Sequence, residues 1–600
     1  MPKFYLIILF AMLSYMASSQ IHITLVVKNE KTKEAVQFCN VGIEGSGLGG
    51  ITNEDGVITM EVPSSYSTDS ISISHIGYEP KNISIPDIGD SKKVVYLKEC
   101  AYVLPEVEVS SDDDVWFQIL NKCRNVNIKQ KNKSSSKAFF SIESTKDDVP
   151  LEVVECFYTA DVSGLKVNDL AFKNGKLFLK KSESGLWTID ASETYKHFDV
   201  FQESDLFPSS ILNFGLSGMK KRFNVEMEFT DDMYKVFFTP KDKSGEYFSG
   251  YIFIDRSDYS LKQIDYFADN ATIYPFYSFT DDSIGSVSLR INETFTDNGS
   301  YVLPELVKYD YSIDYYSRKY GLLESGIFCK IDSKSFLYLY DYGKPFIEPI
   351  FDYYAELSDY RKISLIPYND VFWSNNYKFT ISKSKSEKID YLEREDPSFE
   401  YNSSTNKELV FGDSIKAFWP KNKDVTDKFS FGLFVRPYIK WNNDVKLFIY
   451  EKPPQSESSI QNGYVATQKY KFVVQILLDI TELDDSIHWQ SFTIFDPFQS
   501  YYEYEEHPTE NIFACVNIYF ALCEKIRLDM EERLKKNHRS VEEIRKIYDE
   551  TKRELENFRK KYFLEAGLGE DLLALRLYNA MVIRKFGIDY VEMFKDFHKW

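Results

Sequence analysis

A glycine-rich segment near the N-terminus has the spacing of a phosphate-binding loop. Gly45, Gly47 and Gly50 match the pattern G-x-G-x-x-G and follow a strand-like run. A dinucleotide site needs a helix directly afterwards, because the helix N-terminus holds the pyrophosphate. The segment 51–62 instead has the pattern of a turn followed by a strand. We therefore predict a loop of a β-sandwich here rather than a nucleotide site.

A second short segment has the residues of a calcium-binding loop. Asn53, Asp55 and Gly56 match the start of such a loop. The loop also needs a bidentate Glu at its twelfth position, which is Ser64 when counted from Asn53. The segment is therefore predicted to be a turn.

The sequence motifs of hydrolases are also present only in part. Ser217 lies in Gly-Leu-Ser-Gly-Met, which fails the last position of G-x-S-x-G. Glu152 and Glu155 are close in sequence, but a chain with 92 acidic residues contains such pairs by chance. A glycosidase needs two carboxylates that converge in a cleft, and the sequence does not show that.

The seven histidines are scattered, and none forms H-E-x-x-H. They are His22, His75, His197, His488, His507, His538 and His598. His507 is the one with a candidate role, because it begins the run His-Pro-Thr-Glu before a long predicted helix. The alternative is that His507 or Thr509 caps this helix while Glu510 complements its dipole.

The seven cysteines include no C-x-x-C pair, and their number is far below that of a disulfide scaffold. Cys39 and Cys100 share the N-terminal module and are candidates for pairing. The alternative is that most of the seven are small buried hydrophobes. The sequence therefore assigns no catalytic, cofactor-binding or metal-binding residue.

Length and composition limit the class of protein. A chain of 600 residues is too long for one core and predicts three or four domains. Its net charge of −20 repels nucleic-acid phosphates, so nucleic-acid binding is not expected. Aromatic residues make up 16% of the chain, which favours a β-rich fold. The alternative use of some tyrosines is to line a carbohydrate or peptide surface.

The first nineteen residues have the pattern of a signal peptide. Lys3 supplies a positive start, residues 4–13 are apolar, and Ala17 and Ser19 are small residues before a cleavage point. No later stretch approaches eighteen consecutive apolar residues, so no transmembrane helix is expected in the mature chain. We expect an exported protein that is periplasmic or associated with the outer membrane or cell surface.

Residues 20–110 carry the clearest pattern in the chain. Short alternating runs are separated by Gly, Asn, Asp and Pro, as expected for a two-sheet antiparallel sandwich. The runs lie at 41–44, 57–63, 70–78, 94–97 and 104–109. This block resembles the carboxypeptidase-regulatory-like, transthyretin-like β-sandwich found at the N-terminus of many exported Bacteroidetes proteins. The resemblance implies a structural and interaction domain without catalysis.

The middle of the chain is predicted to be mainly strand. Residues 111–137 are expected to be a linker and a helix, and 138–330 an antiparallel β-sheet domain. The strand–turn–strand pattern over 248–266 resembles the middle region of Bacteroidetes proteins with the same N-terminal module. That resemblance implies a curved sheet of the type seen in lipoprotein carriers.

Residues 331–506 are predicted to form a mixed β-rich region. Strands are predicted at 433–439, 445–450 and 470–478. The charged stretch Lys383–Lys407 is poor in apolar residues and is predicted to be a solvated loop or a flexible insert.

Residues 507–600 change to a helical pattern. Two apolar stripes with alternating spacings of three and four predict an antiparallel helical hairpin with arms of about twenty residues. Ser540 and Glu543 form a capping box at the start of the second arm. Further helices are predicted over 572–584 and 590–598.

The fold class expected from these patterns is α+β and multidomain but mainly β. It comprises an N-terminal Ig/prealbumin-like sandwich, an antiparallel β-rich middle and a C-terminal helical hairpin or bundle. The function expected is that of a non-enzymatic, exported cell-envelope protein that binds an outer-membrane or surface protein or a glycan. One alternative is a hydrolase with a site in 335–510. The other is a carrier of an apolar ligand in the middle β-domain.

Overall fold

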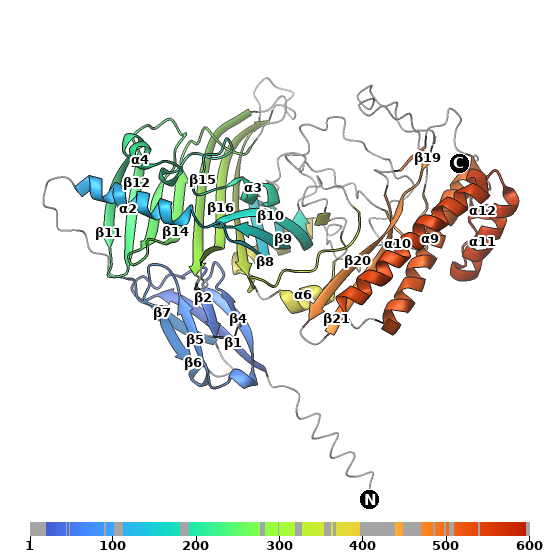
Figure 1. The fold of residues 1–600 in the computed structure, drawn as a ribbon, viewed down its shortest axis with the longest axis horizontal. Helices are drawn as coiled ribbons and strands as arrows, with labels where there is room; N and C mark the ends of the chain where they lie inside the picture. Colours follow the sequence, from blue (N-terminus) through green and yellow to red (C-terminus); the bar gives the residue numbers. More distant parts are fainter. Residues whose placement is uncertain are drawn as a thin grey trace, which may run out of the picture.

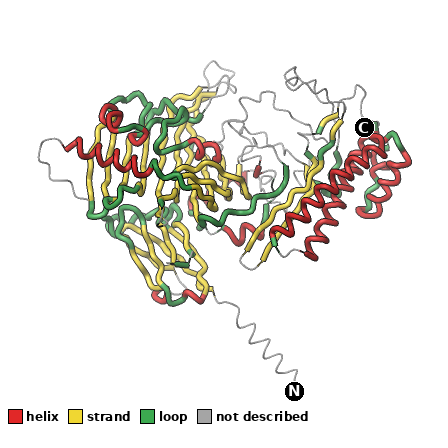
Figure 2. The backbone as a smooth tube through the Cα atoms, in the orientation of Figure 1, coloured by secondary structure: helices red, strands yellow, loops and turns green. Residues whose placement is uncertain are grey.

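The computed structural model describes residues 20–100, 112–179, 191–276, 283–317, 327–352, 362–395, 439–447, 470–502, 509–537 and 540–595, apart from short gaps inside some ranges. The expected signal peptide, the predicted run 104–109 and His507 lie outside these residues. The fold is mixed α/β and mainly strand, with a large antiparallel sheet and helices near the C-terminus (Figures 1 and 2). Within the described helices, none is both long and apolar enough to cross a membrane.

The N-terminal part consists of two small sheets around one core. One sheet has the order β4-β1-β7 and the other β3-β2-β5-β6. The strands are β1 (Gln20–Asn29), β2 (Asn40–Ile43), β3 (Gly49–Ile51), β4 (Val57–Pro63), β5 (Ser70–Ser74), β6 (Lys81–Ser84) and β7 (Lys92–Leu97). Leu25, Ile71 and Ile73 are fully buried in the core that the two sheets enclose.

One strand pair departs from the all-antiparallel expectation. β7 pairs with β1 in parallel, whereas β4 pairs with β1 antiparallel. β7 follows the second sheet in the chain, so it returns to the first sheet by a crossover and enters in the same direction as β1.

The glycine-rich segment 45–50 and the segment 53–56, which resembles a calcium loop, form a loop and a turn of the sandwich, as predicted. The glycine-rich segment joins the antiparallel pair β2 and β3, and a turn and strand follow it rather than a helix. At the next turn, Asn53 Oδ1 accepts hydrogen bonds from the backbone N–H groups of Asp55 and Val57. Gly56 has a φ of 70°, and a Cβ at this position would lie 2.5 Å from the carbonyl oxygen of Val27. The segment therefore needs glycine for its backbone.

A ten-stranded antiparallel sheet forms the centre of the molecule. Its order is β10-β9-β8-β17-β16-β15-β14-β13-β12-β11. The strands are β8 (Lys133–Lys146), β9 (Val149–Ser163), β10 (Lys166–Leu179), β11 (Phe223–Phe229), β12 (Met233–Pro240), β13 (Ser249–Asp255), β14 (Leu261–Ala268), β15 (Ser283–Asp297), β16 (Val302–Ser317) and β17 (Ile327–Tyr340). A large antiparallel sheet is thus present, and its strands run from Lys133 to Tyr340.

Helices cover parts of both faces of this sheet. α2 (Asp112–Asn127) lies in the segment 111–137, which is predicted to hold a linker and a helix, and runs across β11–β14 in Figure 1. Together with α3 (Ala191–His197) and α4 (Leu216–Arg222), it contributes to one large apolar core on that face. α6 (Asp370–Asn376) packs on the opposite face, where Phe372 and Trp373 contact Phe157, which in turn contacts Phe139.

The prediction of a solvated loop over 383–407 is wrong for its first half. Residues 383–395 form α7 (Lys383–Glu395), which packs on β9 and β10. Lys385 Nζ donates to Ser141 Oγ at 2.7 Å and lies 3.5 Å from Glu155 Oε1. Lys388 Nζ lies 2.7 Å from Glu143 Oε2. The charged sequence folds as a helix because its lysines meet buried carboxylates on the sheet.

The N-terminal sandwich contacts the same region. Asp55 Oδ2 accepts a hydrogen bond of 2.7 Å from the backbone N–H of Lys383, at the first residue of α7. The N–H of Thr59 donates to Thr380 Oγ1 at 2.8 Å. Asn40 Nδ2 donates to Glu305 Oε2 on β16 at 3.0 Å. The turn that resembles a calcium loop therefore caps a helix of another part of the chain.

The C-terminal part is a small sheet covered by helices. The sheet has the order β18-β21-β20, and α9 packs against it. The elements are β18 (Ile439–Lys440), β19 (Tyr470–Lys471), β20 (Val474–Leu483), β21 (Ser486–Phe495), β22 (Tyr501–Tyr502), α9 (Glu510–Asn537), α10 (Val541–Ala566), α11 (Leu572–Phe586) and α12 (Tyr590–Phe594). The expected C-terminal helices are present: α9 and α10 pack against each other, and with 28 and 26 residues they are longer than the predicted arms. Ser540 Oγ accepts a hydrogen bond from the N–H of Glu543, as the capping box predicts.

The strand predicted over 445–450 is not formed at its described residues, 445–447. The N–H of Leu447 donates to Asn517 Oδ1 at 2.7 Å, and its carbonyl accepts from Asn517 Nδ2 at 2.8 Å. A side chain of α9 thus takes the place of a neighbouring strand. The strand predicted at 470–478 is split into β19 and β20.

Glu293 is a carboxyl group inside the large apolar core. It lies on β15 between Ile291 and Phe295 on the core-facing side, and only 3% of it is exposed. Burial, and secondarily the Asp199 carboxylate, raise the pKa of Glu293 well above its ordinary value.

We expect Glu293→Gln to stabilise the protein at pH 8 and to have little effect at pH 4. The folded state keeps a proton on Glu293, whereas the unfolded state releases it above the ordinary pKa of glutamate. The stability of the unchanged protein therefore falls as the pH rises from that ordinary pKa toward the raised pKa of Glu293. Thermal unfolding of both proteins from pH 4 to pH 8 checks this. A melting-temperature difference that does not change with pH contradicts it.

Candidate binding groove

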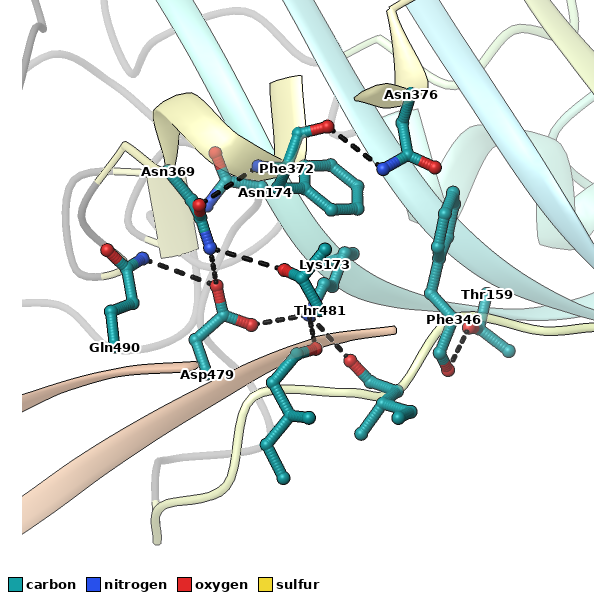
Figure 3. A network of polar contacts seen from close by, with 12 residues as sticks. Thr159, Lys173, Asn174, Phe346, Asn369, Phe372, Asn376, Asp479, Thr481 and Gln490 are labelled. Carbon is teal, nitrogen blue, oxygen red and sulfur yellow. Dashed lines mark hydrogen bonds and ion pairs between the residues drawn. The ribbon is translucent and has the colours of Figure 1, made fainter. Parts of the chain in front are cut away.

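A buried ion pair joins the ten-stranded sheet to the C-terminal sheet (Figure 3). Lys173 lies on β10 and Asp479 on β20, and their side chains are 1% and 0% exposed. Lys173 Nζ also donates to the carbonyl oxygens of Ile347 and Ile480, each at 2.8 Å. All three ammonium protons therefore have acceptors, as a buried cation requires.

Neutral amides complete the environment of the carboxylate. Asn369 Nδ2 donates to Asp479 Oδ2 at 2.9 Å, and Gln490 Nε2 donates to the same oxygen at 3.3 Å. Asn369 is also the N-cap of α6, because its Oδ1 accepts from the N–H of Phe372. Next to Lys173, Asn174 Oδ1 accepts a 2.6 Å hydrogen bond from Trp373 Nε1. The Lys173 ammonium group and both carboxylate oxygens of Asp479 have partners within the protein. We therefore assign this network a structural role.

A groove lies beside the half of β20 that this network leaves uncovered. Its volume is about 820 Å³, within the range of ligand-binding clefts. β20 and α10 form its walls, and it is lined by Asp352, Lys471, Val473, Val474, Gln475, Ile476, Tyr519, Tyr548, Asp549, Thr551, Lys552, Arg553, Leu555, Glu556, Asn557 and Arg559.

The groove follows an edge of the C-terminal sheet. β20 pairs with β21 on one side only, and Leu478 exchanges both backbone hydrogen bonds with Ile350 on the other side. Because backbone direction alternates along a strand, the N–H and C=O groups of Val474 and Ile476 also point to this outer side. The carbonyl of Ile476 accepts a 2.9 Å hydrogen bond from the hydroxyl of Tyr548. No described residue bonds to the outer backbone groups of Val474.

The charged side chains of the groove are largely paired with each other. Lys552 Nζ lies 2.7 Å from Asp352 Oδ2, and Arg559 donates to Glu556 Oε1 at 2.8 Å. The lining holds four cations and three carboxylates, namely Lys471, Lys552, Arg553, Arg559, Asp352, Asp549 and Glu556. It contains no histidine. This arrangement offers polar contacts and a strand edge rather than an acid–base pair.

The residues weighed from the sequence are not brought together at one site. Ser217 lies within α4. Glu152 and Glu155 face opposite sides of the sheet, since Glu152 accepts from Ser144 Oγ and Glu155 lies beside α7. All seven cysteines are described, and none is in a disulfide, so the candidate pair Cys39 and Cys100 is not formed.

The sequence interpretation missed the Lys173–Asp479 pair. The two residues are 306 positions apart, so no local spacing connects them. One signal was present in the sequence: Asp479 directly follows the predicted strand 470–478 and separates its apolar end, Ile-Leu-Leu, from Ile480. A single acid at such a position is seldom buried without a partner.

We expect Lys173→Met to lower the stability of the protein by about 3 kcal/mol, because it leaves Asp479 buried without its cation. Lys552→Met is the matched control. Its pair with Asp352 is exposed by 52% and 66%, so its loss should change stability by less than about 1 kcal/mol. Calorimetric unfolding of the two variants checks the difference, and equal effects would contradict a structural role for the buried pair.

No family model matches the sequence, and no curated protein matches it. Among solved structures, a LolA superfamily protein from Nitrosomonas europaea is 13% identical and covers 38% of this chain and 91% of its own, with a TM-score of 0.14. MucB is 7% identical and covers 38% and 94%, with a TM-score of 0.15. A putative membrane-associated protein of unknown function from Bacteroides fragilis is 10% identical and covers 54% and 99%, with a TM-score of 0.11. TM-scores this low establish neither a shared fold nor a shared function.

Proposed function

We propose that this chain is a non-enzymatic, exported binding protein of a cell envelope. Its groove between β20 and α10 takes an extended segment of a partner polypeptide. The observation that carries the proposal is the groove of about 820 Å³ along the outer edge of β20. An extended peptide can add a strand to such an edge, with main-chain hydrogen bonds for affinity and side-chain pockets for specificity.

The character of the groove favours a polypeptide over a glycan. Carbohydrate sites present aromatic rings as exposed stacking surfaces, but Tyr519 and Tyr548 are 0% and 5% exposed. The strand edge instead offers the outward N–H and C=O of Val474 for main-chain hydrogen bonds. Cations and carboxylates on α10 lie opposite this edge and suit a polar peptide side chain.

The hydrolase alternative gains no support from the groove. Asp352 is the acid that the region 335–510 contributes to its lining, and Lys552 binds it. Arg559 likewise binds Glu556, and the remaining acid of the described lining, Asp549, lies on α10 outside that region. The described lining therefore shows no pair of carboxylates from 335–510 for acid–base chemistry.

The carrier alternative needs an apolar cavity in the large sheet domain, on the face that α2, α3 and α4 cover. In the described residues, side chains from the sheet, α2, α3 and α4 form one continuous buried cluster there. Tyr266, Phe238 and Phe248 are completely buried in it. This packing counts against a ligand space on that face.

The cell-envelope location rests on the sequence. The signal-peptide pattern of residues 1–19 and the resemblance of 20–110 to a carboxypeptidase-regulatory-like domain support it. In the same proposal, the N-terminal sandwich is a structural domain, because its Asp55 contacts α7 and its Asn40 contacts β16.

We expect the full-length tagged protein, purified from its native envelope, to retain a specific polypeptide partner. Val474→Pro should weaken that binding by about tenfold or more, because proline removes the N–H that faces the groove. Mass spectrometry identifies the partner, and titration with the purified partner measures the loss.

Lys546→Glu is the control, because Lys546 is an exposed residue of α10 that does not line the groove. Its partner binding should equal that of the unchanged protein. A Val474→Pro protein that melts normally and binds its partner with unchanged affinity contradicts the groove assignment. A catalytic activity lost on replacement of one carboxylate contradicts the non-enzymatic role.

A further inference from the structure

α11 carries an exposed apolar stripe. Leu573, Leu577 and Met581 follow one another at intervals of four residues and are 71%, 63% and 44% exposed. The opposite side of the helix is buried, since Leu575, Asn579 and Val582 face the C-terminal core. α11 lies at the outer edge of the molecule in Figure 1, and its exposed stripe is on the side of the helix opposite these buried residues.

The stripe has an internal symmetry in sequence. Leu577 is its centre, with Leu573 four residues before it and Met581 four residues after it. Ala574 and Ala580 are each three residues from the centre. Small residues at symmetric positions on both sides of a central leucine allow a second helix to approach closely.

The charges at the two ends of α11 are opposite and equally placed. Glu570 and Asp571 precede the helix, and Arg584 and Lys585 end it. Glu570 and Arg584 are each seven residues from Leu577. A two-fold axis through Leu577 therefore places the acidic end of one helix against the basic end of another.

We propose that the α11 stripe is a docking surface for a second copy of this chain, paired antiparallel about a two-fold axis at Leu577. Leu573 of one copy packs near Met581 of the other, and Glu570 faces Arg584 of the partner copy. This inference is independent of the groove, whose lining contains no residue of α11.

Other occupants fit the charge pattern less well. An anionic lipid surface attracts Arg584 and Lys585 but repels Glu570 and Asp571 at the other end of the same stripe. An acidic peptide meets the same repulsion. A second copy of α11, paired antiparallel, places an opposite charge against both the acidic and the basic end of the helix. A single helix pair buries less surface than a standard stable interface, so the dimer belongs to the weak class.

Sedimentation velocity of the full-length protein over a range of concentrations tests the surface. We expect a reversible monomer–dimer equilibrium, and Leu577→Arg should weaken it by about tenfold or more, because two like charges then meet at the axis. Ile583→Arg is the matched control, since Ile583 is 41% exposed on the same helix but lies off the stripe. It should dimerise like the unchanged protein.

Charge reversal provides the sharper test. Glu570→Arg and Arg584→Glu should each weaken the dimer, and the double variant should restore it to within about threefold, because the opposite charges face each other again. A monomer at every concentration overturns the proposal, as does a double variant that is not restored. A monomer that binds phosphatidylglycerol vesicles, and loses this binding with Leu577→Arg, assigns the stripe to a lipid surface instead and also overturns it.

Discussion

The buried pair of Lys173 and Asp479 is the constraint on which the arrangement of the chain depends. A lysine with 1% exposure is tolerable only when acceptors surround its ammonium group. Those acceptors come from β20 and from the segment before α6, so the edge of the ten-stranded sheet cannot satisfy its own lysine. The large sheet and the C-terminal sheet must therefore be placed together.

The same pair defines which part of β20 remains available. The half of the strand near Leu478 and Ile480 is engaged by Ile350 and Lys173. The other half, near Val474, borders the groove. A strand held at one end and open at the other is a rigid surface for an extended ligand, and rigidity lowers the entropy lost on binding. α10 fixes the width of the groove, because Tyr548 ties this helix to the carbonyl of Ile476.

Local patterns predicted much of the fold and little of the site. The helical hairpin, the N-terminal turns and the antiparallel middle region follow from periodicity and turn residues, which act over a few positions. The charged helix α7 was missed because its folding depends on Glu143 and Glu155, more than two hundred residues away. The absent strand at 445–447 likewise reflects Asn517, a partner on another element. The groove was not predictable for the same reason, since β20 and α10 meet only in three dimensions.

The most direct test of the account is hydrogen–deuterium exchange of the backbone at residues 472–477, measured with and without the polypeptide that copurifies with the protein. Strand addition predicts that the N–H of Val474 exchanges more slowly when the partner is bound, while α11 is unaffected. Exchange at these residues that is unchanged by a bound partner would contradict binding at the β20 edge.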